Sequence, residues 1–283
     1  MRFAIEDAQV RETACPLKLR PHRETSLPHS RSARICIALF VTPLSGLATT
    51  AVAQVRWETS ASVEYSTGSY GGTEATEVVY APLSVAAVAS RWRFAAALPY
   101  VQFEGPGGTV SGGVVVPGTG PVVRQSGLGD LSVGAAYQLV EPVIGRTQWE
   151  LAAAIKIPTA GENLGTGEAD YSLQLGARQP VSDRFTLVAS VGYQWLGDPA
   201  AFELQDGPTA TAGVNFAPAQ GRNLGVQVSY RHPFQHGLEP QTVLNPYVRS
   251  DFSNGWSITG YGTAGLTTGS PDYGVGLSLG RSF

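Results

Sequence analysis

The sequence predicts an all-β protein, a transmembrane antiparallel β-barrel of about 12 strands preceded by a signal peptide. Three observations predict this fold. Segment after segment alternates apolar residues with small or polar ones, a period of two that indicates β-strands. Charged residues make up 14% of the 283, below the roughly 25% of soluble domains, and there are 34 glycines. The body of the chain has no apolar run of the roughly 18 residues that a membrane helix needs.

The first 53 residues are expected to be a leader and a targeting segment. Residues 1–30 are polar and aperiodic, which predicts a disordered leader or a start assigned too early. Residues 31–53 are expected to form a signal peptide, because Arg31 and Arg34 precede a short apolar run that ends in an Ala-x-Ala sequence. A core helix or a membrane anchor is the alternative, disfavoured by the shortness of the run and by its proline and glycine. We expect cleavage after Ala53.

Cleavage would leave one domain, residues 54–283. The removal of seven basic and four acidic residues changes the formal net charge from −3 to about −6. A mildly acidic chain without a basic stripe makes nucleic acid an unexpected partner. Both cysteines, Cys15 and Cys36, precede residue 54, so the domain can have neither a disulfide framework nor a cysteine-based metal site.

Twelve segments are predicted to form strands. Most of them alternate apolar with small or polar residues, and their ranges are 55–65, 76–88, 92–103, 131–139, 149–157, 171–179, 185–195, 209–216, 224–231, 242–250, 256–264 and 273–283. The segment at 209–216 has the weakest alternation. An even number of strands agrees with single-chain bacterial barrels, and about ten tilted residues suffice for one strand to span a bilayer.

The connections alternate in length. Mostly longer linkers follow the odd strands, at 68–72, 105–125, 158–169, 197–207, 232–240 and 267–272. Shorter ones follow the even strands, at 90–91, 140–146, 180–183, 217–221 and 251–255. Because outer-membrane barrels have long extracellular loops and short periplasmic turns, both termini are expected in the periplasm. The longest linker, 105–125, is rich in glycine and proline and is the candidate for a lid or an inward-folding constriction loop.

Aromatic residues gather near the strand ends, as the interfacial girdles of a barrel require. They are Trp57, Trp92, Tyr100, Trp149, Tyr171, Trp195, Tyr230, Trp256 and Tyr273. A soluble β-sandwich or a lipocalin-like barrel is the alternative fold, but it would need neither the loop asymmetry nor an aromatic residue at the C-terminus.

The closing segment 273–283 alternates apolar residues with glycine and serine and ends on Phe283. It resembles the last strand of bacterial outer-membrane barrels, whose C-terminal Phe is read by the barrel-insertion machinery, so Phe283 is the expected insertion signal. Arg281 departs from that pattern, and we expect it at the periplasmic rim, where a long arginine side chain can snorkel. This segment should pair with both its predecessor and segment 55–65.

Four short motifs lie near the loop-facing strand ends. They are Leu98-Pro99-Tyr100, Ser126-Gly127-Leu128-Gly129-Asp130-Leu131, Lys156-Ile157-Pro158-Thr159, and Leu164-Gly165-Thr166-Gly167 followed by Asp170-Tyr171. With these motifs in this order, the chain resembles the outer-membrane transporter family of the phenol-degradation meta-pathway type over most of residues 55–283. The resemblance implies a twelve-stranded barrel and a role in uptake of small, often aromatic or hydrophobic, compounds.

The motif residues also have a physical interpretation. Turn and bulge geometry where strands leave the extracellular loops is the role expected of Gly127, Gly129, Gly165 and Gly167. A phosphate-binding loop is disfavoured, because no helix follows and no lysine stands in register. Asp130 and Asp170 are expected at the extracellular rim, as loop-to-strand caps or as a polar gate or ion contact.

The strand pattern directs one set of side chains into the barrel, because a charge that faces lipid near the midplane costs about 2–4 kcal/mol. This lumen-lining set comprises Arg56, Glu58, Glu64, Arg93, Glu150, Lys156, Arg178, Arg231, Tyr247, Arg249 and Tyr261. Six of its members are cationic and three are acidic, which favours anionic or aromatic-polar solutes. The alternative is that the arginines and glutamates pair into a network that plugs the barrel.

Catalytic and metal sites are not expected. His232 and His236, with Glu239 nearby, could bind a metal, but they lie on a loop with proline and glycine that lacks a fixed geometry. A lipase would need a serine, a histidine and an orienting polar residue held together, and neither histidine lies on a predicted strand. The sequence therefore predicts no catalytic residue, no metal and no cofactor.

The expected protein is a channel of the cell outer membrane for small solutes, aromatic or hydrophobic compounds among them, that works by passive diffusion through an arginine-biased lumen. A closed barrel with a structural or surface-interaction role is the main alternative, and a lipase-type enzyme is the weaker one. Expected partners are membrane lipid and lipopolysaccharide, the barrel-insertion machinery and a small-molecule solute, with the chain a monomer.

Overall fold

The computed structural model describes residues 55–106, 109–111, 114–116, 120–140, 145–161, 164–200 and 203–283. The expected leader (1–30) and signal peptide (31–53) lie outside the described residues. No helix in the described part of the chain is long and apolar enough to cross a membrane.

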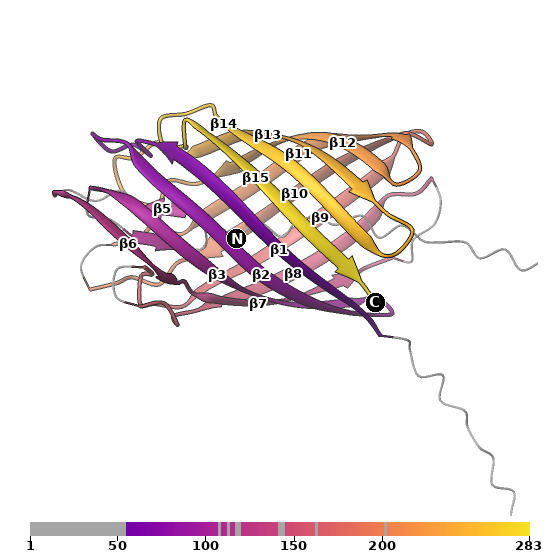
Figure 1. The fold of residues 1–283 in the computed structure, drawn as a ribbon, viewed down its shortest axis with the longest axis horizontal. Coiled ribbons are helices and arrows are strands. Elements are labelled where there is room, and N and C mark those ends of the chain that lie inside the picture. Colours follow the sequence, from indigo (N-terminus) through magenta and orange to yellow (C-terminus); the bar gives the residue numbers. More distant parts are fainter. Residues whose placement is uncertain are drawn as a thin grey trace, which may run out of the picture. The chain divides into compact units, whose positions relative to one another are not determined.

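The described chain is all β, and fifteen strands form one large antiparallel sheet and one small hairpin. The strands are β1 (Arg56–Gly68), β2 (Thr76–Ala89), β3 (Trp92–Pro106), β4 (Thr109–Ser111), β5 (Val114–Val116), β6 (Val122–Leu128), β7 (Leu131–Gln138), β8 (Gln148–Ile157), β9 (Asp170–Pro180), β10 (Phe185–Trp195), β11 (Gly207–Ala219), β12 (Arg222–Arg231), β13 (Gln241–Asp251), β14 (Trp256–Gly265) and β15 (Tyr273–Ser282). The strands lie side by side and tilted around a barrel (Figure 1).

The barrel closes because the last strand, β15, pairs antiparallel with the first, β1. β7 pairs with the first half of β3, and β6 pairs with the second half, so β6 and β7 together form one strand of the wall. With these two counted as one, the 13-stranded sheet has twelve wall strands. All of its strand pairs are antiparallel, which confirms the predicted fold class.

The linker predicted at 105–125 is largely structured, which corrects the loop assignment. β3 runs on to Pro106, and β6 continues the barrel wall beside it, while β4 and β5 form a separate hairpin. β6 was hidden because its alternation is short and follows a stretch rich in glycine and proline. Its backbone hydrogen bonds come from β3, a partner that the local sequence does not reveal.

A β-bulge separates β6 from β7. Tyr100 pairs with Leu128 and Ala97 pairs with Ser132, so three residues of one strand stand opposite two of the other. The bulge is tied by the backbone N–H of Gly129, which donates to the carbonyl of Pro99 at 2.8 Å. The side-chain alternation shifts by one residue here, as a bulge requires.

The outer face of the barrel is apolar and exposed. Along β15, Val275, Leu277 and Leu279 are exposed, while the alternate positions are glycine and serine. The same alternation recurs on the other wall strands, with large exposed hydrophobic side chains on one side and small or polar ones on the other. This face is the one that a lipid bilayer would cover.

The two ends of the barrel differ as predicted. Long connections lie at one end, called the loop end, at 69–75, 107–121, 158–169, 196–206, 232–240 and 266–272. Mostly shorter connections lie at the other, called the turn end, at 90–91, 139–147, 181–184, 220–221 and 252–255, of which 139–147 is the exception in length. Arg281 lies at the turn end opposite Trp256, and its guanidinium stacks 4.9 Å from the Trp256 ring centroid and 5.1 Å from that of Phe283. This position agrees with the prediction that Arg281 lies at a rim of the barrel.

Candidate functional site in the barrel interior

Charged side chains cluster inside the barrel near the turn end. We call Arg56, Glu58, Arg93, Glu150 and Arg178 the turn-end cluster; they stand at inward positions of β1, β3, β8 and β9. Arg56 Nη2 lies 2.7 Å from Glu58 Oε1, and Arg93 contacts the other oxygen of Glu58. Arg93 and Arg178 both act electrostatically on Glu150. Three cations therefore face two acids in this cluster.

The other predicted ionisable residues of the lumen have separate partners. Arg249 binds Asp251, with Nε and Nη2 at 2.9 and 2.8 Å from Oδ1. Arg231 lies at the loop end, where its guanidinium is 5.3 Å from the ring centroid of Phe234. Glu64 accepts a hydrogen bond from the Tyr261 hydroxyl at 3.2 Å.

Lys156 is the centre of a buried charge network at the loop end. Its Nζ lies 2.9 Å from Asp170 Oδ2 and 3.3 Å from Asp130 Oδ2, and it donates to Thr166 Oγ1 at 2.8 Å. The side chains of Lys156, Asp130 and Asp170 are only 4%, 2% and 13% exposed. We call these three residues the Lys156 triad. Lys156 faces inward as expected, but it is enclosed by carboxylates and carries no cationic surface to the lumen.

The two aspartates of the triad also hold loops. Asp130 Oδ1 accepts hydrogen bonds from the backbone N–H groups of Thr159 and Ala160, at 3.1 and 3.0 Å. Asp170 Oδ1 accepts one from Gly197 N at 3.0 Å. These contacts fit the expected capping role, and the ion pairs with Lys156 add to it. The three motifs that contain the triad therefore meet at one place, fastening two loops to the β6–β7 bulge.

Sequence reasoning singled out each triad residue but did not bring them together. The available signal was that Lys156 is the only lysine after residue 53, in a domain that otherwise uses arginine. A compact ammonium can be surrounded by several acceptors, whereas the planar fork of arginine suits paired contacts.

The motif glycines act mainly through close packing rather than turn geometry. A Cβ on Gly165 would lie 2.7 Å from Asp130 Oδ2, and one on Gly127 would lie 2.8 Å from Leu164 Cδ1. Gly129 has a similar restriction, with Pro99 Cγ at 3.0 Å. Only Gly167 among the four has the left-handed backbone, with φ of 76°, that favours glycine in a turn.

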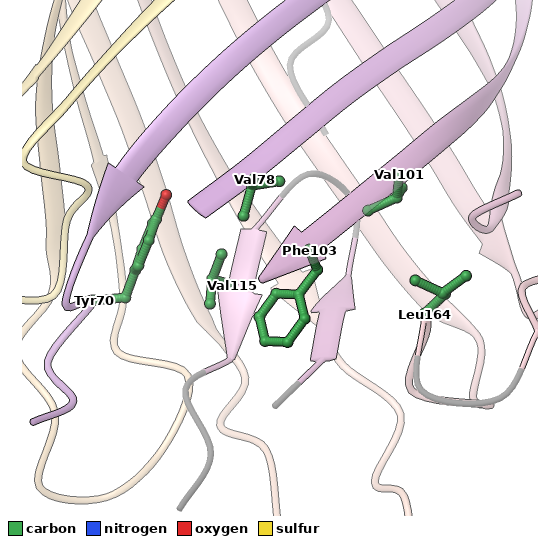
Figure 2. Close-up of a cluster of buried hydrophobic side chains, with 6 residues drawn as sticks. All are labelled: Tyr70, Val78, Val101, Phe103, Val115 and Leu164. Carbon is green, nitrogen blue, oxygen red and sulfur yellow. The ribbon is translucent and has the colours of Figure 1, made fainter. Parts of the chain in front are cut away.

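The β4–β5 hairpin folds into the mouth of the barrel. Val115 of β5 packs in a buried cluster with side chains of β2, β3 and two loops (Figure 2). The members of this cluster are Tyr70, Val78, Val101, Phe103, Val115 and Leu164. Val78, Val101 and Phe103 stand on the inward side of their strands, opposite the exposed positions. β5 therefore lies inside the barrel wall, which confirms an inward-folding segment within 105–125.

The opposite face of β5 is buried too. Val116 packs with Leu204 and Phe234, which belong to two other loops, and Leu196 borders this second cluster. Because successive side chains of a strand point to opposite faces, the hairpin is held from both sides. The loop end thus has an apolar constriction built from β5, the inner wall of β2 and β3, and four loops.

The loop histidines form no metal site in the described part of the chain. Both ring nitrogens of His236 approach Gln205 Nε2, at 2.8 and 2.9 Å, and the carboxylate of Glu239 accepts from Thr268. Among the described residues, no three His, Cys, Asp or Glu side chains are grouped to hold a metal ion.

Residues 276–280 read Gly-x-Ser-x-Gly, the letter pattern of a nucleophile elbow. They lie within the straight strand β15, where the Ser62 hydroxyl donates to Ser278 Oγ at 2.9 Å. A nucleophile elbow requires a sharp strand-to-helix turn, so this serine is a wall residue.

The charge balance of the lumen needs correction. The expected set had six cations and three acids, but Asp130, Asp170 and Asp251 also face inward and pair with members of that set. These three acids balance the lumen overall. Within the turn-end cluster, three cations still stand beside two acids.

A closed antiparallel barrel of twelve strands, with an apolar outer face and long loops at one end, defines the class of outer-membrane β-barrels. The family model described as "Putative MetA-pathway of phenol degradation" matches residues 40–283. The chain belongs to this family. Its place is the cell outer membrane, and its fold is that of an outer-membrane channel.

A solved structure shows the same architecture. The chain is similar to the COG4313 outer membrane channel from Pseudomonas putida F1, with a TM-score of 0.64 and 14% sequence identity over 82% of this chain and 96% of that one. The KdgM porin matches with a TM-score of 0.49 and 10% identity over 79% of this chain and 99% of the porin. The comparison with curated proteins gives no match.

Proposed function

We propose that the protein is a passive channel for small solutes, aromatic or hydrophobic compounds among them, with a preference for anions set near its periplasmic end. Solutes enter at the apolar constriction and leave past the turn-end cluster. The long loops mark the extracellular side and the short turns the periplasmic side.

The turn-end cluster is the observation that carries this proposal. Arg56, Arg93 and Arg178 face Glu58 and Glu150 inside the barrel, so the cluster has three cations and two acids. In a narrow, low-dielectric passage one charge has a large effect on which ions enter. Lys156 is paired with Asp130 and Asp170, and Arg249 is paired with Asp251, so we assign the sign of the selectivity to the turn-end cluster.

A closed barrel without transport is the second candidate. Two observations favour it: Glu58 is paired with two arginines, and the β4–β5 hairpin is packed on both faces at the mouth. Such a barrel would serve a structural or surface-interaction role.

Single-channel recording in a planar bilayer separates the two candidates. A channel should give discrete conductance steps, and its reversal potential in a salt gradient should show anion preference. Arg93→Gln should reduce this preference, and Glu150→Gln should increase it. Arg124→Gln is the matched control, because Arg124 forms an exposed pair with Glu104 away from the lumen. The absence of current would support the closed barrel, and cation preference would reject the anion-selective lumen.

A further inference from the structure

Two tyrosines stand side by side on the inner wall between the constriction and the turn-end cluster. Tyr247 of β13 and Tyr261 of β14 are direct cross-strand partners. Both occupy inward positions and are only partly buried, so solvent in the lumen reaches them. They therefore line an accessible part of the passage.

The ring of each tyrosine lies flat over a glycine of the neighbouring strand. A Cβ on Gly225 of β12 would lie 2.3 Å from Cε1 and 2.4 Å from Cζ of Tyr247. A Cβ on Gly276 of β15 would lie 2.2 Å from Cζ of Tyr261. These glycines are the cross-strand partners of the tyrosines, so each ring extends sideways along the wall and away from the other ring.

Hydrogen bonds fix both rings in this orientation. The Tyr247 hydroxyl crosses β12 and donates to Asn215 Oδ1 on β11 at 2.6 Å. The Tyr261 hydroxyl crosses β15 and donates to Glu64 Oε2 on β1 at 3.2 Å. Six adjacent wall strands, which lie side by side in Figure 1, thus contribute one row of cross-strand partners. In order from β11 to β1, these are Asn215, Gly225, Tyr247, Tyr261, Gly276 and Glu64. With one face on glycine and the hydroxyl tied to the wall, each ring presents its other face to the lumen.

We propose that Tyr247 and Tyr261 form a stacking face that binds planar, monocyclic aromatic solutes during their passage. This proposal rests on the proposed channel function and assigns its aromatic preference to one place. Aromatic rings attract each other in offset-stacked arrangements, and a ring held flat is already in the required orientation. A saturated ring of the same size is puckered and lacks a π-face, so it gains less from the same surface.

The matched pair of probes is benzoate and cyclohexanecarboxylate. They carry the same charge and the same number of non-hydrogen atoms, so the effect of the turn-end cluster cancels in their flux ratio. The full mature chain is reconstituted in liposomes, and protein-free vesicles give the leak to be subtracted. The wild-type protein should pass benzoate faster, and the Tyr247→Leu/Tyr261→Leu variant should lower the flux ratio about two- to tenfold.

Two further variants separate stacking from a merely structural role. Gly276→Ala should displace the Tyr261 ring from the wall and lower the ratio while the tyrosine remains. Gly260→Ala is its control, because a Cβ there meets nothing within 4 Å, and it should leave the ratio unchanged. Tyr247→Phe/Tyr261→Phe keeps both rings and should retain the preference. An unchanged ratio in the double leucine variant, or an equal fall of both fluxes, overturns the stacking face.

A binding measurement tests the stacking face even if the barrel conducts nothing. Line broadening of 4-fluorobenzoate in ¹⁹F NMR, with detergent-solubilised protein, should exceed that of 4-fluorocyclohexanecarboxylate and should be lost in the double leucine variant. This result without flux would reject the channel and keep the site. Equal broadening of the two probes rejects the site, whatever the flux.

Discussion

Replacing Lys156 with methionine is expected to lower the free energy of unfolding by about 3–5 kcal/mol. The substitution keeps the length of the side chain but removes the cation that lies between two carboxylates. Asp130 and Asp170, 2% and 13% exposed, would then carry two negative charges away from water. Their backbone hydrogen bonds from Thr159, Ala160 and Gly197 remain, but these do not neutralise the charge. Breaking a buried pair by removing one partner has this cost because the remaining charge is uncompensated.

The assay is a urea titration of the protein refolded into lipid vesicles, followed by tryptophan fluorescence and by the heat-dependent change in gel migration. The triple variant Asp130→Asn/Lys156→Met/Asp170→Asn should recover most of the loss, since no charge stays buried. Arg124→Gln removes an exposed ion pair of 3.8 Å and should change stability by less than about 1 kcal/mol. A Lys156→Met variant within about 1 kcal/mol of wild type would show that the two carboxylates do not depend on the lysine.

Four other predictions concern the apolar constriction, the pairing of β1 with β15 that closes the barrel, and the N-terminus. Val116→Asp should release the β4–β5 hairpin from the barrel mouth, because the carboxylate cannot pack against Leu204 and Phe234. Conductance and the rate of protease cleavage near residue 116 should both rise, and unchanged values would contradict a role of Val116 in holding the hairpin. Burial raises the pKa of Tyr70 to about 12, so its contribution to stability is complete below pH 10 and is lost as the pH rises through 12. Between pH 10 and about 12, the urea midpoint of unfolding of the Tyr70→Phe variant should therefore fall less steeply than that of the wild type. Cysteines at Ser62 and Ser278, whose hydroxyls are 2.9 Å apart, should form a disulfide detectable by gel shift, whereas cysteines at Ser60 and Ser278, two residues out of register, should not. N-terminal sequencing should find Gln54 first, and a start near Met1 would reject the signal peptide.

The barrel could be predicted from the sequence because its signals are local. An alternation such as Val275, Leu277 and Leu279 needs no knowledge of the partner strand, and twelve such segments with unequal connections define the architecture. β6 and the β4–β5 hairpin were missed for the opposite reason. Their order comes from β3 and from buried contacts of Val115 and Val116, which are distant in sequence.

The interior could be predicted only as a list of inward residues. Which of them meet depends on the cross-strand register, and alternation alone does not supply it. The stacking of Tyr247 on Gly225 and the convergence of Asp130 and Asp170 on Lys156 both require that register. A count of inward charges therefore overstated the positive bias, because the acids that balance it lie at strand ends, where the pattern gives no direction.

The bulge between β6 and β7 marks a place where the wall of the barrel can lose a residue. Leu128 and Val133 are exposed on the outer face on either side of it, although they are an odd number of residues apart. Loss of one residue at 129–130 would make this separation even, so β6 and β7 could continue as one regular strand with both side chains still facing outward. The same loss would draw the backbone around Asp130, the partner of Lys156, into the strand ladder. Such a deletion should therefore keep the barrel wall and disturb the Lys156 triad.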